Sequence, residues 1–239
     1  MTNVGDHIYA ERGNWRFSGA ASRRFDDHVS KSVPLYLEGH QLICDLSDYF
    51  VNAESTTYDI GCSTGTLTLK MAEHNKLKPS ARFVGVDIED DMIAVAQKKR
   101  EVSPSLNVEF LAGNVLEIDL EPADMVVCYY TVQFVRPSVR QQLVDKLYQA
   151  LNWGGALVLF EKVRGADARF QDIMTALYTD YKLRMGYSAD DIVAKSRSLK
   201  GILEPFSTQG NIDLLRRAGF TDINTVQKCL CFEGFLAIK

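Results

Sequence analysis

The stretch that most constrains the fold of this chain is residues 57–69, which read Thr-Tyr-Asp-Ile-Gly-Cys-Ser-Thr-Gly-Thr-Leu-Thr-Leu. A short apolar run enters a glycine-punctuated turn and a helical pattern begins at Leu67, which predicts a strand, a tight loop and a helix. Gly61 and Gly65 lack a Cβ, so the backbone there can adopt positive φ or let a ligand approach closely. Amide groups at the helix start favour an anionic or electron-rich ligand group. We therefore expect a loop that binds a nucleotide-type cofactor.

The spacing of the two glycines narrows the kind of cofactor. A dinucleotide-binding loop reads G-x-G-x-x-G, whereas this one reads Asp-x-Gly-x-x-x-Gly from Asp59 to Gly65. That pattern resembles motif I of the Rossmann-like methyltransferases that depend on S-adenosylmethionine (SAM). The resemblance implies that Asp59 and residues 61–65 face the methionine part of SAM. A glycine-rich turn in some other α/β protein is the alternative.

Composition and charge exclude several classes of protein. With 46% hydrophobic residues, the 239-residue chain can bury a full core, and its net charge of -4 argues against electrostatic capture of nucleic acid. The five scattered cysteines are typical of reduced thiols in a cytoplasmic protein, and the Cys229-x-Cys231 spacing does not match a zinc knuckle. We expect no metal. No run is apolar and long enough to span a membrane, so we expect a cytoplasmic location.

Strand and helix patterns alternate through the middle of the chain, which predicts a parallel, doubly wound sheet. Residues 1–19 are expected to form a partly ordered arm. Two helices, separated at Pro34, form an N-terminal helical cap over residues 20–50. We expect helices at 22–30, 36–50, 90–102 and 136–151 and strands at 82–87, 108–112, 124–130 and 155–162.

The alternation breaks after the fifth strand. Residues 166–204 contain two helical stretches, 170–185 and 189–203, and Ser188 begins the second as a capping-box residue. After a further helix, the runs 222–227 and 230–238 are too close together for a crossover helix and must pair antiparallel. The prediction is one α/β domain over residues 1–239, with a Rossmann-like seven-stranded methyltransferase sheet, an antiparallel C-terminal hairpin, the helical cap and the helical insertion.

In such a sheet the ligand lies across the carboxyl ends of the strands. Asp87 ends the second strand, where a carboxylate can accept both ribose hydroxyls; its alternative role is to cap the next helix, for which Asp90 is better placed. Asn114 follows the third strand, where its oxygen can accept from the adenine amino group while Val115 lies against the ring. The fourth strand ends at residues 128–130, beside the reactive end of the cofactor.

The candidate catalytic residues are Tyr129, Glu161 and His28. Glu161 and Lys162 end the fifth strand and point to the site, or else form an ion pair that closes the strand. His28 lies in the helical cap and is either a general base or a surface residue.

With these residues placed, the chain resembles the carboxy-SAM synthases of the tRNA wobble-uridine modification pathway. The resemblance runs nearly end to end. It is carried by Gly13-x-Trp15-x-Phe17, Ser32-Val33-Pro34-x-Tyr36, Tyr58-Asp59-Ile60-Gly61-Cys62-Ser63, Thr131-x-Gln133-Phe134, Gly154-Gly155-Ala156-Leu157-Val158-Leu159 with Glu161-Lys162, Gly186-Tyr187-Ser188, and Ala218-Gly219-Phe220.

That family has a methyltransferase fold but converts SAM, with prephenate as carboxylate donor, into carboxy-SAM. Two positions depart from the family pattern. Tyr129 stands where the family has asparagine, and Ser196 stands where it has an arginine that holds the extra carboxylate, with Arg197 one residue late. One residue on a helix is a rotation of about 100°. The resemblance implies that the cofactor is lined by Tyr36, Gly61, Cys62, Ser63, Asp87, Ile88, Asn114 and Val115.

Because of these departures, our leading prediction is methyl transfer from SAM to a small or medium-sized acceptor, with S-adenosyl-L-homocysteine as the product. Tyr36, Tyr129 and Tyr130 would shape the acceptor pocket, and Glu161 or His28 would be the base.

The alternatives are a carboxy-SAM synthase, in which Lys195 and Arg197 supply the anion site, and a non-catalytic SAM-binding partner protein. Family analogy also implies a homodimer formed through the helical insertion. We expect no direct binding of nucleic acid and no membrane partner.

Overall fold

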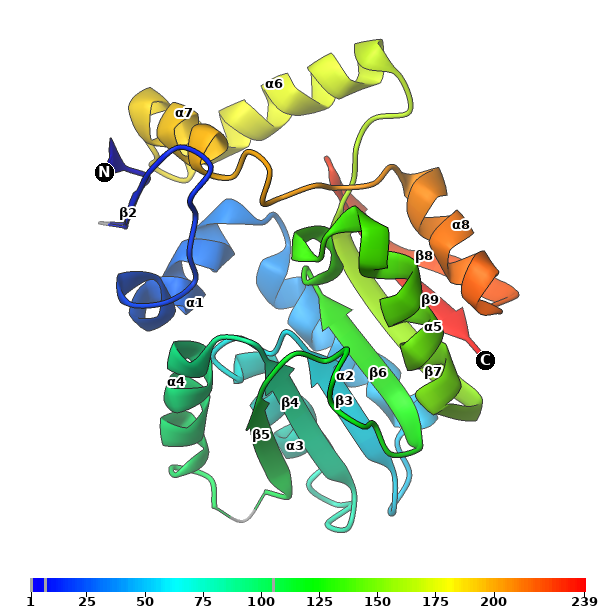
Figure 1. Cartoon of the computed structure of the whole chain (residues 1–239). Coiled ribbons are helices and arrows are strands. Elements are labelled where there is room, and N and C mark those ends of the chain that lie inside the picture. Colours follow the sequence, from blue (N-terminus) through cyan, green and yellow to red (C-terminus); the bar gives the residue numbers. More distant parts are fainter. Residues whose placement is uncertain (1, 7, 105) are drawn as a thin grey trace.

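The computed structural model describes residues 2–6, 8–104 and 106–239. Its centre is a seven-stranded sheet in the order β5-β4-β3-β6-β7-β9-β8 (Figure 1), with β5, β4, β3, β6 and β7 parallel and β9 antiparallel to both β7 and β8. The predicted sheet and its C-terminal hairpin are confirmed. The strands are β3 (Thr56–Ile60), β4 (Arg82–Asp87), β5 (Val108–Ala112), β6 (Ala123–Tyr129), β7 (Leu151–Lys162), β8 (Asp222–Cys229) and β9 (Phe232–Ile238).

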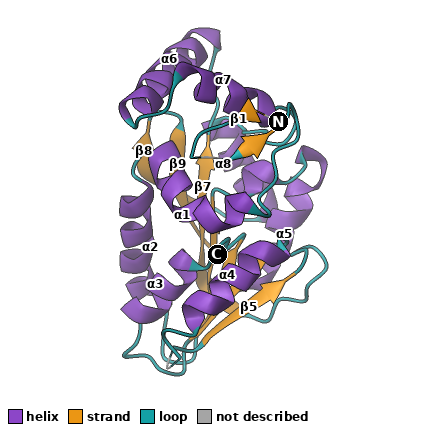
Figure 2. Cartoon of the chain, turned by 90° about the vertical axis from the view of Figure 1, so that its left-hand side faces the viewer, coloured by secondary structure: helices purple, strands orange, loops and turns teal. Residues whose placement is uncertain are grey.

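Helices cover both faces of the sheet (Figure 2). Successive side chains of a strand point to opposite faces, so Met125 and Val127 of β6 join one buried cluster and Val126 joins the other. The first cluster packs against α2, α3 and α4, and the second against α5 and α8. These helices are α2 (Tyr36–Phe50), α3 (Thr66–His74), α4 (Asp90–Arg100), α5 (Arg140–Ala150) and α8 (Thr208–Ala218).

Three more helices lie beyond the carboxyl ends of the parallel strands: α1 (Ala20–Ser32), α6 (Ala168–Arg184) and α7 (Ala189–Ser198). Ser188 forms the expected capping box with Asp191 at the start of α7. That helix ends at Ser198, five residues before the predicted end, because a turn follows at residues 199–202.

The prediction of a partly ordered N-terminal arm is wrong for the described residues. Short strands β1 (Thr2–Asn3) and β2 (Tyr9–Ala10) pair with each other. Val4, Ile8 and Trp15 are buried in a cluster that also includes side chains of α7 and of the turn after it. Isolated apolar residues in a polar stretch have no periodicity that the sequence could show, so only tertiary packing reveals their burial.

Several other boundaries differ from the prediction, among them those of α1, α4, α6, β6 and β7. The start of the helix expected at 136–151 is the 3₁₀ turn η2 (Pro137–Val139), and α5 starts only at Arg140. Another 3₁₀ turn, η1 (Val132–Phe134), precedes it. Glu89, not Asp90, occupies the N-cap position of α4, and Asp90 is the first residue of the helix. The five cysteines are free thiols, as expected.

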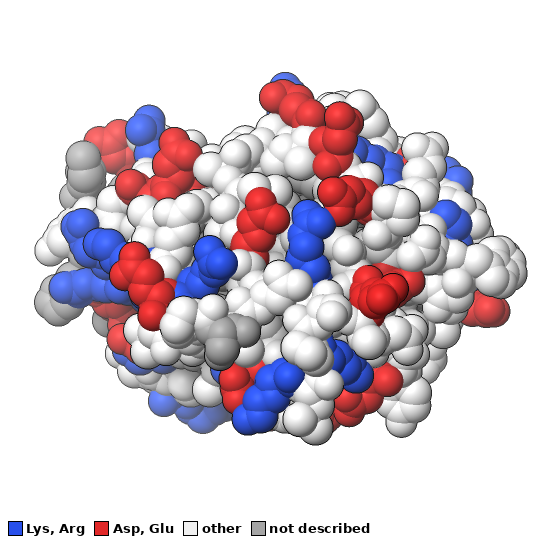
Figure 3. All heavy atoms as spheres, turned by 90° about the horizontal axis from the view of Figure 1, so that it is seen from below, with Lys and Arg blue, Asp and Glu red and all other residues white. Residues whose placement is uncertain are grey.

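The described residues contain neither a helix long and apolar enough to cross a membrane nor a group of three metal-binding side chains. On the face that Figure 3 shows, acidic and basic side chains are interspersed, in keeping with the small net charge.

Candidate active site

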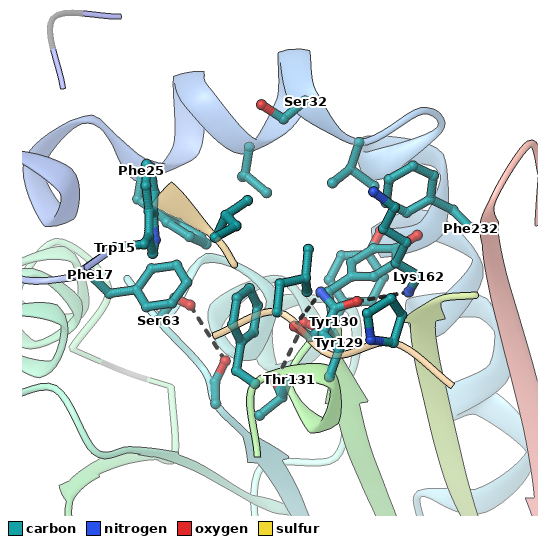
Figure 4. A pocket seen from close by; sticks show the side chains of 18 of the residues that line it. Trp15, Phe17, Phe25, Ser32, Ser63, Tyr129, Tyr130, Thr131, Lys162 and Phe232 are labelled. Atoms are coloured by element: carbon teal, nitrogen blue, oxygen red, sulfur yellow. Dashed lines mark hydrogen bonds between the residues drawn. The ribbon is translucent and has the colours of Figure 1, made fainter. Parts of the chain in front are cut away.

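A cavity of about 620 Å³ lies at the carboxyl ends of β3, β4, β5, β6 and β7. Its floor is formed by the ends of these strands and its roof by α1, α6, α7 and the N-terminal segment. In Figure 4, Ser32 on α1 lies above Tyr129, Tyr130 and Lys162 at the strand ends. The predicted residues that line it are His28, Tyr36, Gly61, Ser63, Asp87, Ile88, Asn114, Val115, Tyr129, Tyr130 and Lys195.

The glycine loop has the predicted backbone conformation. Gly61 and Gly65 have φ of 74° and 71°, and Ser63 between them also has a positive φ of 51°. A Cβ on Gly61 would overlap the side chain of Thr131, and one on Gly65 would overlap Phe110. Gly65 does not line the cavity, so its glycine serves the packing of the loop on the sheet.

The expectation that the loop presents free amides is wrong for most of its residues. The amides of Gly61 and Cys62 donate to the carbonyl of Val86, at 2.7 and 3.1 Å, and the Gly65 amide donates to the Cys62 carbonyl. The Ser63 amide donates to Asp87. These bonds tie the loop to β4 and use the donors that a ligand would need.

Asp87 is the polar centre of this end of the cavity. Its two carboxylate oxygens accept from the backbone amides of Ser63 (2.8 Å) and Glu89 (2.9 Å), and 9% of the residue is exposed. Burial raises its pKa above the ordinary value, while the amide bonds oppose that rise. A carboxylate oriented in this way keeps lone pairs for two hydroxyl groups of a ribose.

Asp59 does not line the main cavity. Thr68 of α3 donates to its Oδ2 at 2.6 Å, and burial raises its pKa to about 7. Asp59 and Cys62 instead border a small adjoining cavity of about 20 Å³, which shares Tyr36, Gly61 and Ser63 with the main one. An acidic residue there faces the position next to the glycine loop where the amino-acid tail of SAM is expected.

The wall of the cavity formed by residues that follow β4 and β5 suits an adenine ring. Ile88 is 68% exposed although it is a large apolar residue, and it lines the cavity near Met92 and Val115. The oxygen of Asn114 accepts from the Leu116 amide at 3.1 Å, which orients the side chain and leaves one lone pair for a donor. The residues present therefore fit the sugar and base of an adenosyl cofactor.

Tyr129 closes the side of the cavity under α2. Its hydroxyl donates to the Tyr36 carbonyl at 2.6 Å, and the two rings lie 5.0 Å apart. A Cβ at Gly39 of α2 would overlap this hydroxyl, so Gly39 gives the tyrosine its space. Burial raises the pKa of Tyr129, so the side chain is a neutral donor and a wall of the cavity.

Tyr130 is held in an unusual backbone conformation, with φ of 60°. Side chains larger than glycine, asparagine or aspartate rarely adopt this region, and such strain concentrates at functional sites. Its hydroxyl is buried and finds no hydrogen-bond partner among the described residues, and the ring lines the cavity beside Phe160 and Phe232.

Glu161 and Lys162 point in opposite directions from the end of β7. The expectation that both face the site is wrong for Glu161, which is 1% exposed, lines neither cavity, and accepts from the Val132 and Gln133 amides near Arg140. The alternative of an ion pair between the two is wrong as well. Lys162 enters the cavity because adjacent residues of a strand alternate between its faces.

Two lysines meet at one tyrosine ring in the roof. The Nζ atoms of Lys162 and Lys182 lie 4.6 and 4.5 Å from the centre of the Tyr178 ring. Neither ammonium has a carboxylate partner within the described part of the chain, and burial lowers the pKa of both, that of Lys182 to about 8. The sequence analysis missed Lys182 and Tyr178. Both lie on α6 in a mixed polar pattern that gives no signal without the tertiary structure.

His28 and Lys195 meet on the other side of the roof. His28 is buried and not a surface residue, and its Nε2 lies 2.5 Å from the Lys195 Nζ. Ser196 lines the cavity, whereas Arg197, which is turned by about 100° from it on the helix, does not. Arg197 is exposed and its carbonyl accepts from Gly13. Of the two residues expected to supply an anion site, only Lys195 lies there.

The fold, with its cavity at the carboxyl ends of the strands, is that of the Rossmann-like SAM-dependent methyltransferases. The methyltransferase domain family matches residues 58–155. Among solved structures, magnesium protoporphyrin IX methyltransferase from Synechocystis superposes with a TM-score of 0.66 at 14% identity, over 93% of this chain and 96% of that one. Human N-acetylserotonin methyltransferase superposes with a TM-score of 0.56 at 16% identity, over 94% and 60%.

Similarity to known sequences is closer and covers nearly the whole chain. Carboxy-S-adenosyl-L-methionine synthase from Staphylococcus epidermidis is 35% identical over 226 residues, which is 94% of this chain and 97% of the relative. The synthase from Campylobacter jejuni is 35% identical over 225 residues, 94% of each chain. The chain therefore belongs to the carboxy-SAM synthase family. It is a SAM-dependent enzyme of the transferase class, as the sequence predicted.

Proposed function

We propose that this protein is a carboxy-SAM synthase that uses prephenate, the reaction that the sequence analysis gave as the alternative. The observation that supports it is the pair of lysines, Lys162 and Lys182, that face the cavity without a carboxylate partner among the described residues. Buried cations without a counter-ion are costly, so a cavity that keeps them suits an anionic substrate. The name of the relatives gives the product, carboxy-SAM, and the family resemblance implies prephenate as the donor. The positive charge of the cavity agrees with a carboxylate donor.

The sulfonium of SAM makes its methyl group acidic as well as electrophilic. In the proposed reaction the methyl carbon exchanges a proton for a carboxyl group. Prephenate loses that carboxyl group and its ring hydroxyl, becomes an aromatic 2-oxo acid, and releases water with the methyl proton. The chain's contribution is to hold the two molecules in contact and exclude water, with Asp87 on the ribose and Lys162 and Lys182 on the donor's carboxylates.

A second candidate is methyl transfer to an acceptor that the sequence does not identify. Two departures favour it: Tyr129 in place of the family's asparagine and Ser196 in place of its arginine. Losing one charge-assisted bond to the extra carboxylate would cost about 1.5–3 kcal/mol, which weakens carboxy-SAM binding without abolishing it if a lysine takes over.

Mass spectrometry of the protein's co-purifying ligand separates the two. Carboxy-SAM is expected, and it should also form when purified protein is incubated with SAM and prephenate. Recovery of SAM or S-adenosyl-L-homocysteine alone, with no carboxylated product in the incubation, would exclude the synthase and favour methyl transfer.

The homodimer stays a prediction from family analogy. Phe170, Ile173 and Leu177 form an exposed apolar stripe on α6, which is the helical insertion expected to pair. Light scattering at micromolar concentration is expected to give the mass of a dimer, and a monomer would contradict this. The cytoplasmic location and the absence of direct nucleic-acid binding also stay predictions.

A further inference from the structure

Three segments far apart in the sequence place a chain of polar side chains at the roof of the cavity. Asp6 lies in the N-terminal segment, His28 on α1 and Lys195 on α7. The Asp6 Oδ2 lies 2.7 Å from His28 Nδ1, and His28 Nε2 lies 2.5 Å from Lys195 Nζ. The ammonium also donates to the Ser32 hydroxyl at 2.8 Å.

The direction of these hydrogen bonds follows from the charge of His28. Burial and the nearby Lys195 lower the pKa of His28 to about 4, so its ring is neutral at pH 7. Nδ1 then donates to the Asp6 carboxylate and Nε2 accepts from Lys195. The Trp15 ring stacks on the imidazole with 5.7 Å between centres and fixes its plane.

Asp6 is held as an anion at the far end of the chain. Burial raises its pKa, but hydrogen bonds from Tyr187, Lys31 and His28 outweigh this and lower it to about 2. The Tyr187 hydroxyl donates to Oδ2 at 2.7 Å and Lys31 to Oδ1 at 3.0 Å. The carboxylate is therefore charged at neutral pH.

The charge of Lys195 is finely balanced. Burial and the like charges of Lys182 and Lys162 lower its pKa to about 7, and the Asp6 carboxylate opposes them. With one donor on His28 and one on Ser32, a third N–H of the ammonium remains for a group in the cavity.

We propose that Asp6 and His28 are positioning residues that hold Lys195 toward an anionic group of the substrate, and that Lys195 takes up a proton when this anion binds. This rests on the anionic substrate proposed above. It also explains how the site can lack an arginine at Ser196: a neighbouring lysine, aimed by a histidine and an aspartate, supplies the cation. The N-terminal segment is then part of the substrate site through Asp6.

The affinity of the site for an anion is expected to fall as the pH rises. An anion binds the charged form of Lys195, so binding raises the pKa of this lysine. Below pH 7 the lysine is already charged and the affinity is flat. Above pH 7 the affinity falls up to tenfold per pH unit, and each binding event takes up close to one proton.

Nuclear magnetic resonance of protein labelled with ¹³C at lysine Cε measures this directly, with the Lys195 signal assigned by Lys195→Arg. Malonate serves as a stable dicarboxylate probe. In the free protein Lys195 is expected to titrate near pH 7 and, with saturating malonate, at least one unit higher. Asp6→Asn should move the free titration about one unit lower, whereas Asp27→Asn, an equal charge change on the exposed side of α1, should leave it unchanged.

A Lys195 signal that titrates above pH 9 in the free protein would overturn the proposal. The proposal would also be overturned if Lys195 titrated at the same pH in Asp6→Asn and Asp27→Asn while the two variants had matching melting temperatures. The same holds if saturating malonate left the Lys195 titration unchanged. Lys195→Arg is expected to bind malonate with a flat pH profile and no proton uptake. Failure to form carboxy-SAM from SAM and prephenate would remove the proposed function while leaving the Lys195 titration standing.

Discussion

The two halves of the cavity are built in different ways. The cofactor half comes from the ends of adjacent strands, and backbone amides hold its key carboxylate, that of Asp87. The half that we propose for the substrate comes from segments as much as 181 residues apart, joined through polar side chains such as Asp6 and Tyr187. One half is determined by local sequence and the other by tertiary packing. We therefore expect changes in the first half to affect SAM and changes in the second to affect the anionic substrate.

The largest effect that tests this division is expected for Asp87→Ala. Loss of two hydrogen bonds to a charged acceptor should weaken SAM binding at least 100-fold, because each is worth about 1.5–3 kcal/mol. Isothermal calorimetry measures the affinity. Asp87→Asn is the control, since it keeps an oxygen for the Ser63 or Glu89 amide and should lose less. Affinity within about threefold of the native value would remove Asp87 from the ribose role.

The opposite pattern, a loss of substrate affinity without a loss of SAM affinity, is expected for Lys162→Met and Lys182→Met. Each should weaken binding of prephenate about 10- to 100-fold, because a charge-assisted bond is lost, and leave SAM affinity unchanged. Calorimetric titration of each ligand on the same variants compares the two halves directly. Lys200→Met, on the rim of the cavity, is a matched control that should change prephenate affinity much less. A loss of SAM affinity equal to that of prephenate would contradict the division.

Lys182 should lower the stability of the folded protein, because its ammonium is buried without a carboxylate partner among the described residues. Burial lowers the pKa of Lys182 to about 8 in the folded protein from an ordinary value of 10.5. The unfolded chain therefore binds more protons between these values, and native stability rises with pH across that window. Lys182→Met should raise the melting temperature by about 2–4 °C, for a gain of about 1 kcal/mol, at pH 6 to 8. This gain should shrink between pH 8 and 10.5; a gain that is constant with pH would contradict it.

The division also explains what the sequence could predict. The bounds of α2, β4 and β5 were predicted to the residue. The apolar face of α2 begins shortly after Pro34, and the short apolar runs of β4 and β5 end at Asp87 and just before Gly113. The placement of Asp87 followed from its position at the end of β4. Glu161 could not be placed in the same way. Because β7 is buried on both faces, its alternation shows that Glu161 and Lys162 point to opposite faces of the sheet, but not which of them faces the cavity.

The substrate half was largely beyond the sequence. Lys182 and Tyr178 line the cavity, and Asp6 contacts His28, only when α6 and the N-terminal segment fold over the sheet. No local period in the sequence marks these residues. Of the two cations predicted for the anion site, Lys195 lines the cavity and Arg197 does not, because one residue on a helix turns the side chain by about 100°.

The smallest effect is expected where α2 contacts the end of β6, between the two halves of the cavity. In most helices Gly→Ala is stabilising by about 0.5–1 kcal/mol. At Gly39 the added methyl group would overlap the Tyr129 hydroxyl, which cannot move away without breaking its bond to the Tyr36 carbonyl. Gly39→Ala should therefore lower the free energy of unfolding by about 1–3 kcal/mol, as overpacking does.

In a Tyr129→Asn background, which restores the residue of the family pattern, the same Gly39→Ala change should be neutral or stabilising, because the shorter side chain leaves room for the methyl group. Urea unfolding of the four proteins gives the coupling energy, expected at about 2 kcal/mol. Additive effects would mean that Gly39 is not kept for Tyr129. Coupling of the expected size would mean that the two residues are matched, so that the departure at Tyr129 is accommodated by the helical cap rather than by the cofactor half of the site.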